Sequence, residues 1–385
     1  MKALMVASVA SMIDQFNREN IALLQKMGYE VDVACNFEVG NTSSKERVDT
    51  FRQELQQQNV KTFQIPIPRK MFAFSDMIKA YKKLKKLIEE EQYTLIHCHS
   101  PIGSVLARLA CRKQRKHGLK LIYTAHGFHF FTGAPKKNWL IFYPIEKFFA
   151  KYTDILITIC TEDFERAKRR KLGRKVVYSP GVGINVEQIK KVEKNEEKRQ
   201  KLGIGKKDIL ILSVGELNQN KNHKTVLQAI SQLERTDIHY VICGQGALEV
   251  ELMKMAKENG MESRVHLLGF RTDVIEWMKV ADIFAFPSCR EGLPVSLMEA
   301  MAAGLPVVCS RIRGNVDLIE EGEGGYLCKP LDTANFAKNL SKLLVSSEQR
   351  EAMGKINQNK VQRFDNSKVS EVMKKVYGDV LTTQR

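Results

Sequence analysis

The sequence predicts an α/β protein built from two doubly wound parallel-sheet domains. Short apolar runs alternate with helix-like segments along the chain, which is typical of parallel sheets covered by helices on both faces. This rhythm restarts after a charged stretch without aromatic residues, 190–207. A chain of 385 residues also corresponds to about two domains, at roughly 100–200 residues for each.

In the first half, the stretch MKALMVASVA is interpreted as a strand, because it is too short for a signal peptide and the polar MIDQFNREN follows at once. The expected strands are Ala3–Ala7, Glu30–Cys35, Thr94–Cys98, Leu121–Thr124 and Ile155–Ile159. The expected helices are Phe16–Met27, Met77–Glu91 and Gly103–Lys116. An aromatic segment extends to Tyr152 without an assigned element.

The second half repeats the alternation. Its expected strands are Ile209–Val214, His239–Cys243, Val265–Leu268, Ile283–Pro287 and Leu305–Ser310. Its expected helices are Lys224–Leu233, Leu248–Asn259, Val274–Val280 and Leu297–Ala303. The domain boundary is placed at the turn-rich Ser179–Gly183, which gives domains 1–180 and 181–361. Ligands of open α/β sheets bind beyond the carboxyl ends of the strands, so the site is expected in a cleft between two facing sheets.

Composition narrows the possible partners without choosing one. The formal net charge of +17 attracts phosphates, whether on nucleic acid, on anionic lipids or in a pyrophosphate substrate. The eight cysteines form no CxxC pair, and we expect them to be reduced and mostly buried. No apolar run approaches the length of about 18 residues that indicates a membrane-spanning helix, so any membrane contact is expected to be peripheral.

The segment FPSCREGLPVSLMEAMAAGLPVVCS, 286–310, carries the strongest functional signal. Glu291 follows a strand in a loop, and Glu299 lies on the next helix, about two turns further along. Backbone N–H groups at the start of this helix form a candidate pyrophosphate site. The two carboxylates then fit the hydroxyl groups of one extended ligand. The donor-binding candidates of this segment are Gly292, Leu293, Pro294, Val295, Ser296 and Glu299.

This segment closely resembles the donor-site motif of family 4 glycosyltransferases, which have the GT-B fold. The resemblance implies that Glu291 contacts the donor hexose and that Glu299 contacts the ribose. The stretch ILSVGELNQNKNHKTVLQA, 211–229, resembles the part of the family that holds the donor pyrophosphate, with Lys221 at the phosphate-binding lysine. Its ammonium group would neutralise the leaving diphosphate. The C-terminal helix, 362–385, resembles the segment that packs back on the N-terminal domain.

Two further stretches agree with the family, and one position departs from it. Gly244 and Gly246 in ICGQGALEVEL match the Gly-x-Gly turn and are expected to allow a close approach to the donor. The segment 269–288 resembles the part that meets the nucleotide base, around Phe270 and Arg271. Glu216 stands where many members have arginine, and a carboxylate there would repel a pyrophosphate. We hypothesise that Arg290 supplies the missing charge.

In the N-terminal half, TLIHCHSPIGSVLARLA, 94–110, and the segment 123–160 resemble the subgroup that builds capsules and exopolysaccharides. His126 aligns with a family histidine that binds the donor sugar or phosphate, and we count it with Glu291 and Lys221 as catalytic. The loop 8–17 lacks the glycines usual in the family, and Asp14 is a candidate for the acceptor side. The other acceptor-side candidates are His99, His129 and Phe130. The alternative for these histidines is a structural role. No metal-ligand spacing is present, and the resemblance implies metal-independent catalysis.

A basic and partly aromatic surface is expected in the N-terminal domain, where it suits an anionic membrane. The basic candidates are Lys79, Lys82, Lys83, Lys85, Lys86, Arg108, Arg112, Lys113, Arg115, Lys116, Lys136 and Lys137. The aromatic ones are Phe128, Phe130, Phe131, Trp139, Phe142, Tyr143, Phe148 and Phe149. The expected location is cytoplasmic, peripheral on the inner face of the cell membrane. The alternative is solvated basic faces over an ordinary core.

The resemblance thus implies a retaining glycosyltransferase without a cofactor. It would move a hexose or N-acetylhexosamine from a nucleoside-diphosphate sugar, with UDP favoured, to a polyprenyl-diphosphate-linked saccharide in bacterial surface polysaccharide synthesis. A sugar-nucleotide 2-epimerase and a non-catalytic GT-B scaffold are the alternatives. Nucleic-acid binding is not expected, because the positive charge is dispersed and no such motif is present.

Overall fold

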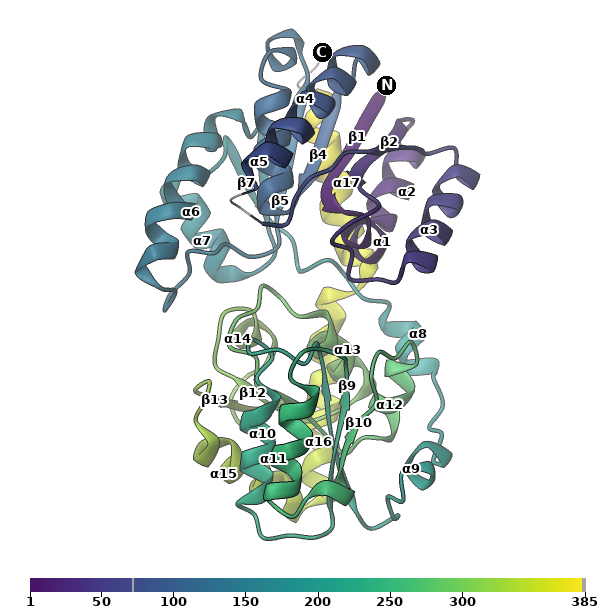
Figure 1. The fold of residues 1–385 in the computed structure, drawn as a ribbon, viewed down its shortest axis with the longest axis vertical. Helices are drawn as coiled ribbons and strands as arrows, with labels where there is room; N and C mark the ends of the chain where they lie inside the picture. The colour runs from purple at the N-terminus through teal and green to yellow at the C-terminus, as the bar shows by residue number, and fades with distance from the viewer. Residues whose placement is uncertain (71–72, 383–385) are drawn as a thin grey trace. The chain divides into compact units, whose positions relative to one another are not determined.

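The computed structural model describes residues 1–70 and 73–382, so residues 383–385 of the predicted C-terminal helix lie outside the described residues. The chain divides into two compact units. Unit 1 comprises Met1–Val182 and Ser367–Arg385, and unit 2 comprises Gly183–Asn366. Each unit contains one parallel sheet with helices on both faces (Figure 1), which confirms the predicted fold class.

Unit 1 contains a seven-stranded sheet with the order β3-β2-β1-β4-β5-β6-β7, in which all neighbouring strands are parallel. The strands are β1 (Lys2–Val9), β2 (Glu30–Asn36), β3 (Lys61–Gln64), β4 (Leu95–His99), β5 (Lys120–Ala125), β6 (Ile155–Thr158) and β7 (Lys175–Tyr178). Chain progression reverses between β1 and β4. This position is the topological switch point, where doubly wound sheets bind their ligands.

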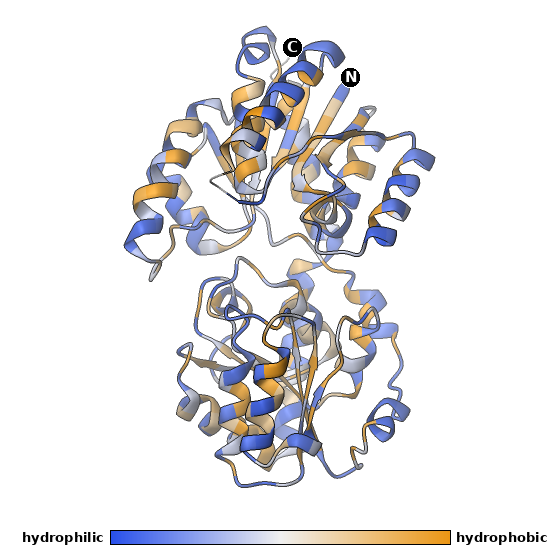
Figure 2. Cartoon of the chain, viewed as in Figure 1, coloured by the Kyte–Doolittle hydropathy of each residue, from blue (hydrophilic) through white to orange (hydrophobic). Residues whose placement is uncertain are grey.

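The helices of unit 1 cover the two faces of its sheet and bury separate apolar clusters. One face is covered by α1 (Ala10–Phe16), α2 (Arg18–Lys26), α3 (Lys45–Gln57) and α17 (Asn366–Thr382). The other is covered by α4 (Phe74–Glu91), α5 (Pro101–Ala110), α6 (Lys136–Phe149) and α7 (Thr161–Arg170). Short 3-10 turns lie at η1 (Gln114–His117) and η2 (Ala150–Tyr152). Figure 2 shows the strands as mostly hydrophobic and the helices as amphipathic.

Unit 2 contains a six-stranded parallel sheet with the order β10-β9-β8-β11-β12-β13. The strands are β8 (Ile209–Val214), β9 (Ile238–Cys243), β10 (Val265–Leu267), β11 (Ile283–Phe286), β12 (Val307–Ser310) and β13 (Gly325–Cys328). The helices are α8 (Val186–Lys191), α9 (Glu197–Lys201), α10 (His223–Ser231), α11 (Glu249–Glu258), α12 (Val274–Val280), α13 (Val295–Ala303), α14 (Asn315–Leu318), α15 (Thr333–Val345) and α16 (Ser347–Lys360), with 3-10 turns η3 (Glu262–Arg264) and η4 (Val361–Phe364). Its switch point lies between β8 and β11.

Several elements differ from the sequence expectation. The expected helix Phe16–Met27 corresponds to α2, whereas the segment 8–17, expected as a loop, contains the additional helix α1, which ends just before the buried Asn17. The aromatic segment before Tyr152 contains α6, whose 14 residues include Pro144. The charged stretch 190–207 contains the helix α9, whose buried Arg199 donates hydrogen bonds to the carbonyl of Val280 and to Asp282.

The C-terminal helix α17 belongs to the core of unit 1. Val369, Met373, Val376 and Tyr377 are buried against the sheet face that α1, α2 and α3 also cover. Over the described part of the chain, no helix is both long and apolar enough to cross a membrane.

Candidate functional site

The loops that follow β8 and β11 meet at the switch point of unit 2. The Nζ atom of Lys221, from the β8–α10 loop, lies 2.7 Å from Oε1 of Glu291, from the β11–α13 loop. Both side chains are partly open to solvent, at 22% and 15% exposure. The ammonium group also lies 5.0 Å from the centre of the Phe286 ring. An anion at this position would therefore compete with Glu291 for the lysine.

Main-chain and amide hydrogen bonds join these two loops independently of the ion pair. The N–H of Cys289 donates to the carbonyl of Asn220 at 2.7 Å, and the Asn220 amide donates to the carbonyl of Arg290 at 3.1 Å. The buried Asn222 donates to the carbonyl of Pro287 at 3.1 Å. The backbone near Lys221 and Glu291 is thus preorganised, so a change of either side chain leaves the loops with most of their contacts.

Arg313 and Gly314, which follow β12, support the Glu291 loop from the other side. The buried Arg313 donates from Nε to the carbonyl of Glu291 at 3.0 Å. A Cβ at Gly314, where φ is +80°, would lie 1.9 Å from the carbonyl oxygen of Gly292. Neither residue is among the candidates that the sequence predicts. The sequence feature that could have identified them is an Arg-Gly pair shortly after a buried strand, at the same sheet edge as the Glu291 loop.

Glu299 lies on α13, whose N-terminal turn begins after Pro294 without a side-chain cap. The N–H groups of Val295 and Ser296 therefore have no intrahelical partner, as in any first helical turn. No hydrogen bond to the Glu299 carboxyl is recorded among the described residues, and burial raises its pKa to about 7. A half-buried carboxyl with a raised pKa favours a ligand that donates hydrogen bonds, such as a diol.

This raised pKa predicts a pH-dependent stability of the ligand-free protein. Between the ordinary pKa of about 4.5 and the folded value of about 7, the folded state binds the extra proton, so stability falls as pH rises through this window. Glu299→Gln is therefore expected to raise the melting temperature by several degrees at pH 8 and by far less at pH 5. The corresponding change in the free energy of unfolding is roughly 3 kcal/mol at most. Thermal unfolding at both pH values checks this, with the exposed Glu323→Gln as control. An equal shift at both pH values would contradict it.

The predicted glycine turn after β9 is constrained mainly by the protein itself. A Cβ on Gly244 would lie 1.8 Å from the carbonyl oxygen of Gly215, and one on Gly246 would lie 2.5 Å from that of Leu217. Gly244 also forms an isolated antiparallel bridge with Gly269. The glycines thus let the loops after β8, β9 and β10 pack together at one edge of the sheet.

The loop after β10 carries Phe270 and Arg271. The Phe270 ring is 65% exposed, which leaves its face free to stack on a planar ligand. The Arg271 guanidinium pairs with Asp273, at 2.7 and 2.6 Å. Glu216 and Arg290 are both exposed, and no partner is recorded for either side chain in the described chain. The charge exchange suggested for Arg290 stays a hypothesis.

Three histidines of unit 1 lie close together near the carboxyl ends of β4 and β5. Nδ1 of His99 lies 3.1 Å from Nε2 of His126, and the His97 and His99 rings lie 4.2 Å apart. His97 contacts the hydroxyl of Tyr377 at 2.9 Å and that of Thr124 at 2.8 Å. Burial lowers the pKa of His126 to about 4 and that of His97 to about 3, so both are neutral at pH 7.

The contacts of His99 favour one tautomer of His126. Nε2 of His99 lies 3.1 Å from Sδ of Met5, which accepts hydrogen bonds but has no proton to donate. Nε2 therefore carries the His99 proton, and Nδ1 of His99 accepts from the Nε2–H of His126. Nδ1 of His126 is then a lone-pair acceptor, for which no partner is recorded within the described residues. Such a nitrogen suits a hydroxyl group better than a phosphate.

Three acceptor-side expectations need correction. The Phe130 ring is fully buried and stacks on Phe128 at 4.7 Å, so it is a core residue. The Asp14 carboxylate is 9% exposed and pairs with Arg18 and Arg47, so its role is structural. His99 is 1% exposed and supports His126 from behind. His129 remains a candidate, since its half-buried ring stacks on Phe142 at 4.3 Å.

The basic and aromatic surface of unit 1 contains fewer of the candidate residues than the sequence predicts. Arg108 is fully buried and pairs with Glu146 at 2.8 Å, and Arg115 pairs with Asp154. Phe128, Phe130 and Phe149 are buried. The large apolar side chains that are exposed on α4 and α6 are Phe74, Ile78, Leu140, Ile141 and Phe148. The predicted basic residues of α4 and α6, which are lysines, therefore lie on the same helices as these exposed apolar side chains.

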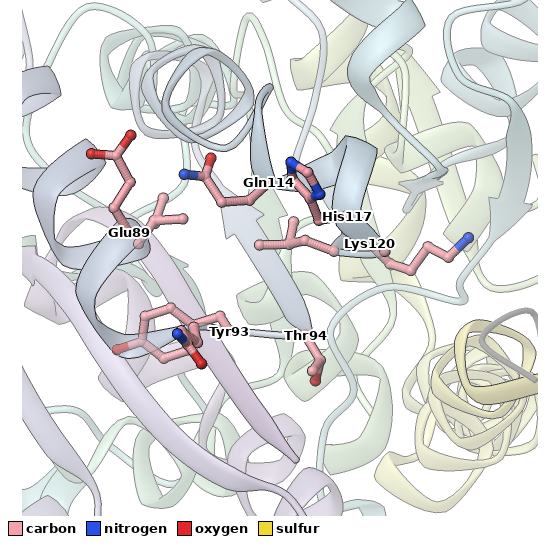
Figure 3. A pocket seen from close by; sticks show the side chains of 10 residues that line it. Glu89, Tyr93, Thr94, Gln114, His117 and Lys120 are labelled. Carbon is pink, nitrogen blue, oxygen red and sulfur yellow. The ribbon is translucent and has the colours of Figure 1, made fainter.

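Two pockets of unit 1 lie at opposite edges of its sheet. One, of about 680 Å³, adjoins the amino ends of β4 and β5 and is lined by Glu89, Tyr93, Thr94, Gln114, His117 and Lys120, among others (Figure 3). This edge lies opposite the one where parallel sheets bind ligands. The other, of about 410 Å³, adjoins the carboxyl ends of β1 and β4. The described residues contain no group of three or more His, Cys, Asp or Glu side chains that would hold a metal ion.

Two parallel-sheet units, with the loops of Lys221 and Glu291 at the switch point of unit 2, are the arrangement found in the GT-B class of glycosyltransferases. Residues 16–183 match the family model described as Glycosyltransferase Family 4, and residues 194–360 match that described as Glycosyl transferases group 1. A Bacillus subtilis (strain 168) protein that bears the name glycosyltransferase EpsD is 36% identical over 381 residues, 98% of this chain and 96% of that protein. The chain therefore belongs to glycosyltransferase family 4 and is a glycosyltransferase.

Other relatives carry more specific names. The UDP-Gal:alpha-D-GlcNAc-diphosphoundecaprenol alpha-1,3-galactosyltransferase of Escherichia coli is 30% identical over 296 residues, 73% of this chain and 74% of that protein. Among solved structures, Anabaena Alr3699/HepE in complex with UDP and glucose superposes with a TM-score of 0.78 at 19% identity, over 98% of this chain and 100% of that one. This structural likeness confirms the GT-B fold.

Proposed function

We propose that the protein is a retaining glycosyltransferase that moves a hexose or N-acetylhexosamine from a UDP-sugar to a polyprenyl-diphosphate-linked saccharide. It would act in bacterial surface polysaccharide synthesis, at the inner face of the cell membrane. The observation that carries this proposal is the Lys221–Glu291 pair at the β8/β11 switch point, with Glu299 on the following helix. The Escherichia coli relative supports the substrate class, since its name states both a UDP-sugar and a diphosphoundecaprenol acceptor.

In the proposed donor complex, the diphosphate takes Lys221 away from Glu291 and lies near the first turn of α13. Glu291 then accepts hydrogen bonds from hexose hydroxyls, and Glu299 accepts them from the ribose. The loop residues Gly292, Leu293 and Pro294 shape the turn between the two carboxylates. Gly244 and Gly246 keep the neighbouring loop close, and Phe270 and Arg271 lie on the base side. Lys221 and the helix N–H groups stabilise the negative charge that develops on the leaving diphosphate.

The transfer breaks the bond between the anomeric carbon and the diphosphate oxygen and forms one to the acceptor oxygen on the same face. The acceptor hydroxyl proton passes to the leaving diphosphate, so no protein nucleophile is needed. His126, neutral and with a free lone pair on Nδ1, accepts a hydrogen bond from a sugar hydroxyl. No step of this scheme uses a metal ion.

The test supplies purified protein with UDP-, GDP- and dTDP-sugars and with a short polyprenyl-diphosphate-linked sugar as acceptor. Release of UDP that requires the acceptor, together with a product of the transferred mass and retained anomeric configuration, is the expected result. Conversion of the donor sugar without an acceptor would favour the 2-epimerase instead. Absence of both turnover and a donor-induced thermal shift would overturn the proposal.

A further inference from the structure

The 410 Å³ pocket of unit 1 lies at the β1/β4 switch point and is mainly apolar. Its polar end contains Ser8 and Ser100, whose hydroxyl oxygens lie 2.7 Å apart at the carboxyl ends of β1 and β4. Arg69 lies at its border and is exposed. The apolar lining comes from α1, α4, α5 and α6, through Met12, Met77, Ile102, Val105, Phe142 and Ile145.

The apolar lining continues onto exposed helix surface on both sides. On α6, Ile141 and Phe148 lie four residues before and three residues after the pocket residue Ile145, so they are its neighbours on the helix. Their exposed fractions are 38% and 55%. On α4, Phe74 lies three residues before the pocket residue Met77 and Ile78 directly follows it; their exposed fractions are 64% and 54%. Figure 2 shows hydrophobic residues along α6.

The base of the pocket is closed by a buried ion pair. Glu146 lines the pocket and accepts a hydrogen bond from Arg108 at 2.8 Å, and the Arg108 guanidinium lies over Tyr123 at 4.7 Å. This carboxylate is therefore already neutralised. The other polar lining residues, Ser8, Ser100, His129 and Arg69, leave most of the lining apolar, and apolar contact is what an isoprenoid chain needs.

We infer that this pocket binds the isoprene units next to the diphosphate of the lipid-linked acceptor. The inference rests on the proposed function. The saccharide lies toward the carboxyl edge of the sheet, and the diphosphate lies near Arg69. The chain then passes between α4 and α6, beside Phe74, Ile78, Ile141 and Phe148. The lysines Lys79, Lys82, Lys136 and Lys137, on these same two helices, complement the charge of a diphosphate and of an anionic bilayer.

The first test does not depend on turnover. A geranyl diphosphate that carries a diazirine on its second isoprene unit is photolysed with the full-length protein, and the labelled peptides are identified by mass spectrometry. We expect label on α4, α5 or α6. Unlabelled geranyl diphosphate should prevent this labelling, and phosphatidylglycerol vesicles should not. Label elsewhere, or equal competition by vesicles, would overturn the inference, because the surface would then bind bulk lipid.

The second test compares two acceptors that share one sugar diphosphate but carry a methyl or a geranyl group. Each buried methylene strengthens binding about fourfold. The kcat/KM for the geranyl acceptor is therefore expected to be at least tenfold higher than that for the methyl acceptor. Val105→Phe fills the pocket and should remove this preference by raising KM for the geranyl acceptor. Leu140→Asn, on the exposed side of α6, is the matched control. Equal kcat/KM for both acceptors refutes the pocket, whereas failure of both acceptors with every donor refutes the proposed function.

Discussion

Replacement of Glu291 by glutamine is expected to lower kcat/KM by about 10²–10³-fold, the range found when one preorganised charge-stabilising group is lost from an active site. Glutamine keeps the volume of the side chain, but its amide has one acceptor oxygen and no charge to offer Lys221 or the hexose hydroxyls. The backbone of the loop is retained by Arg313, Asn220 and Asn222, so the position of residue 291 should not change.

The measurement is acceptor-dependent UDP release, with thermal unfolding of the same samples. Because the Lys221–Glu291 pair is partly exposed, its loss should change the free energy of unfolding by no more than about 1 kcal/mol. Glu323→Gln, an exposed change in the same unit, should match the wild type in both assays. A Glu291→Gln enzyme within threefold of wild-type kcat/KM would remove Glu291 from the mechanism.

The local pattern of the sequence is sufficient to predict the strand, loop and helix that carry Glu291 and Glu299. Glycine and proline after an apolar strand, followed by a helix with Glu299 two turns along, predict the β11–loop–α13 unit directly. The meeting of Lys221 with Glu291 is less local, since 70 residues separate them. Parallel strands explain why both loops share one edge, but no local pattern gives the strand order that makes β8 and β11 neighbours.

The errors have the same physical origin. Asp14 looked free because Arg47, one of its partners, lies 33 residues away on α3. Arg108 looked like a surface charge because its partner Glu146 lies 38 residues away on α6. Which aromatic residues of the 128–149 segment are exposed depends on packing between helices, and a count of aromatics cannot show it. Arg313 was missed because its contact with the Glu291 loop depends on β12 lying beside β11.

Lys221 is expected to contribute through charge rather than through packing. Lys221→Met keeps most of the side-chain volume against Phe286 and removes the ammonium group. It should lower kcat by about 10²–10³-fold, because the charge on the leaving diphosphate increases in the transition state and Lys221 then stabilises it most. UDP affinity should fall less than kcat. Lys221→Arg should keep part of the kcat that Lys221→Met loses, since a cation remains.

The double variant Lys221→Met/Glu291→Gln separates a shared role from two independent ones. Because the two groups form one ion pair and act on one donor, their losses should not multiply, and the double variant should lie within about threefold of the worse single variant. The complete cycle is measured as kcat and kcat/KM at saturating acceptor. Fully multiplicative losses would mean that the action of Lys221 on the diphosphate and that of Glu291 on the hexose are not energetically coupled.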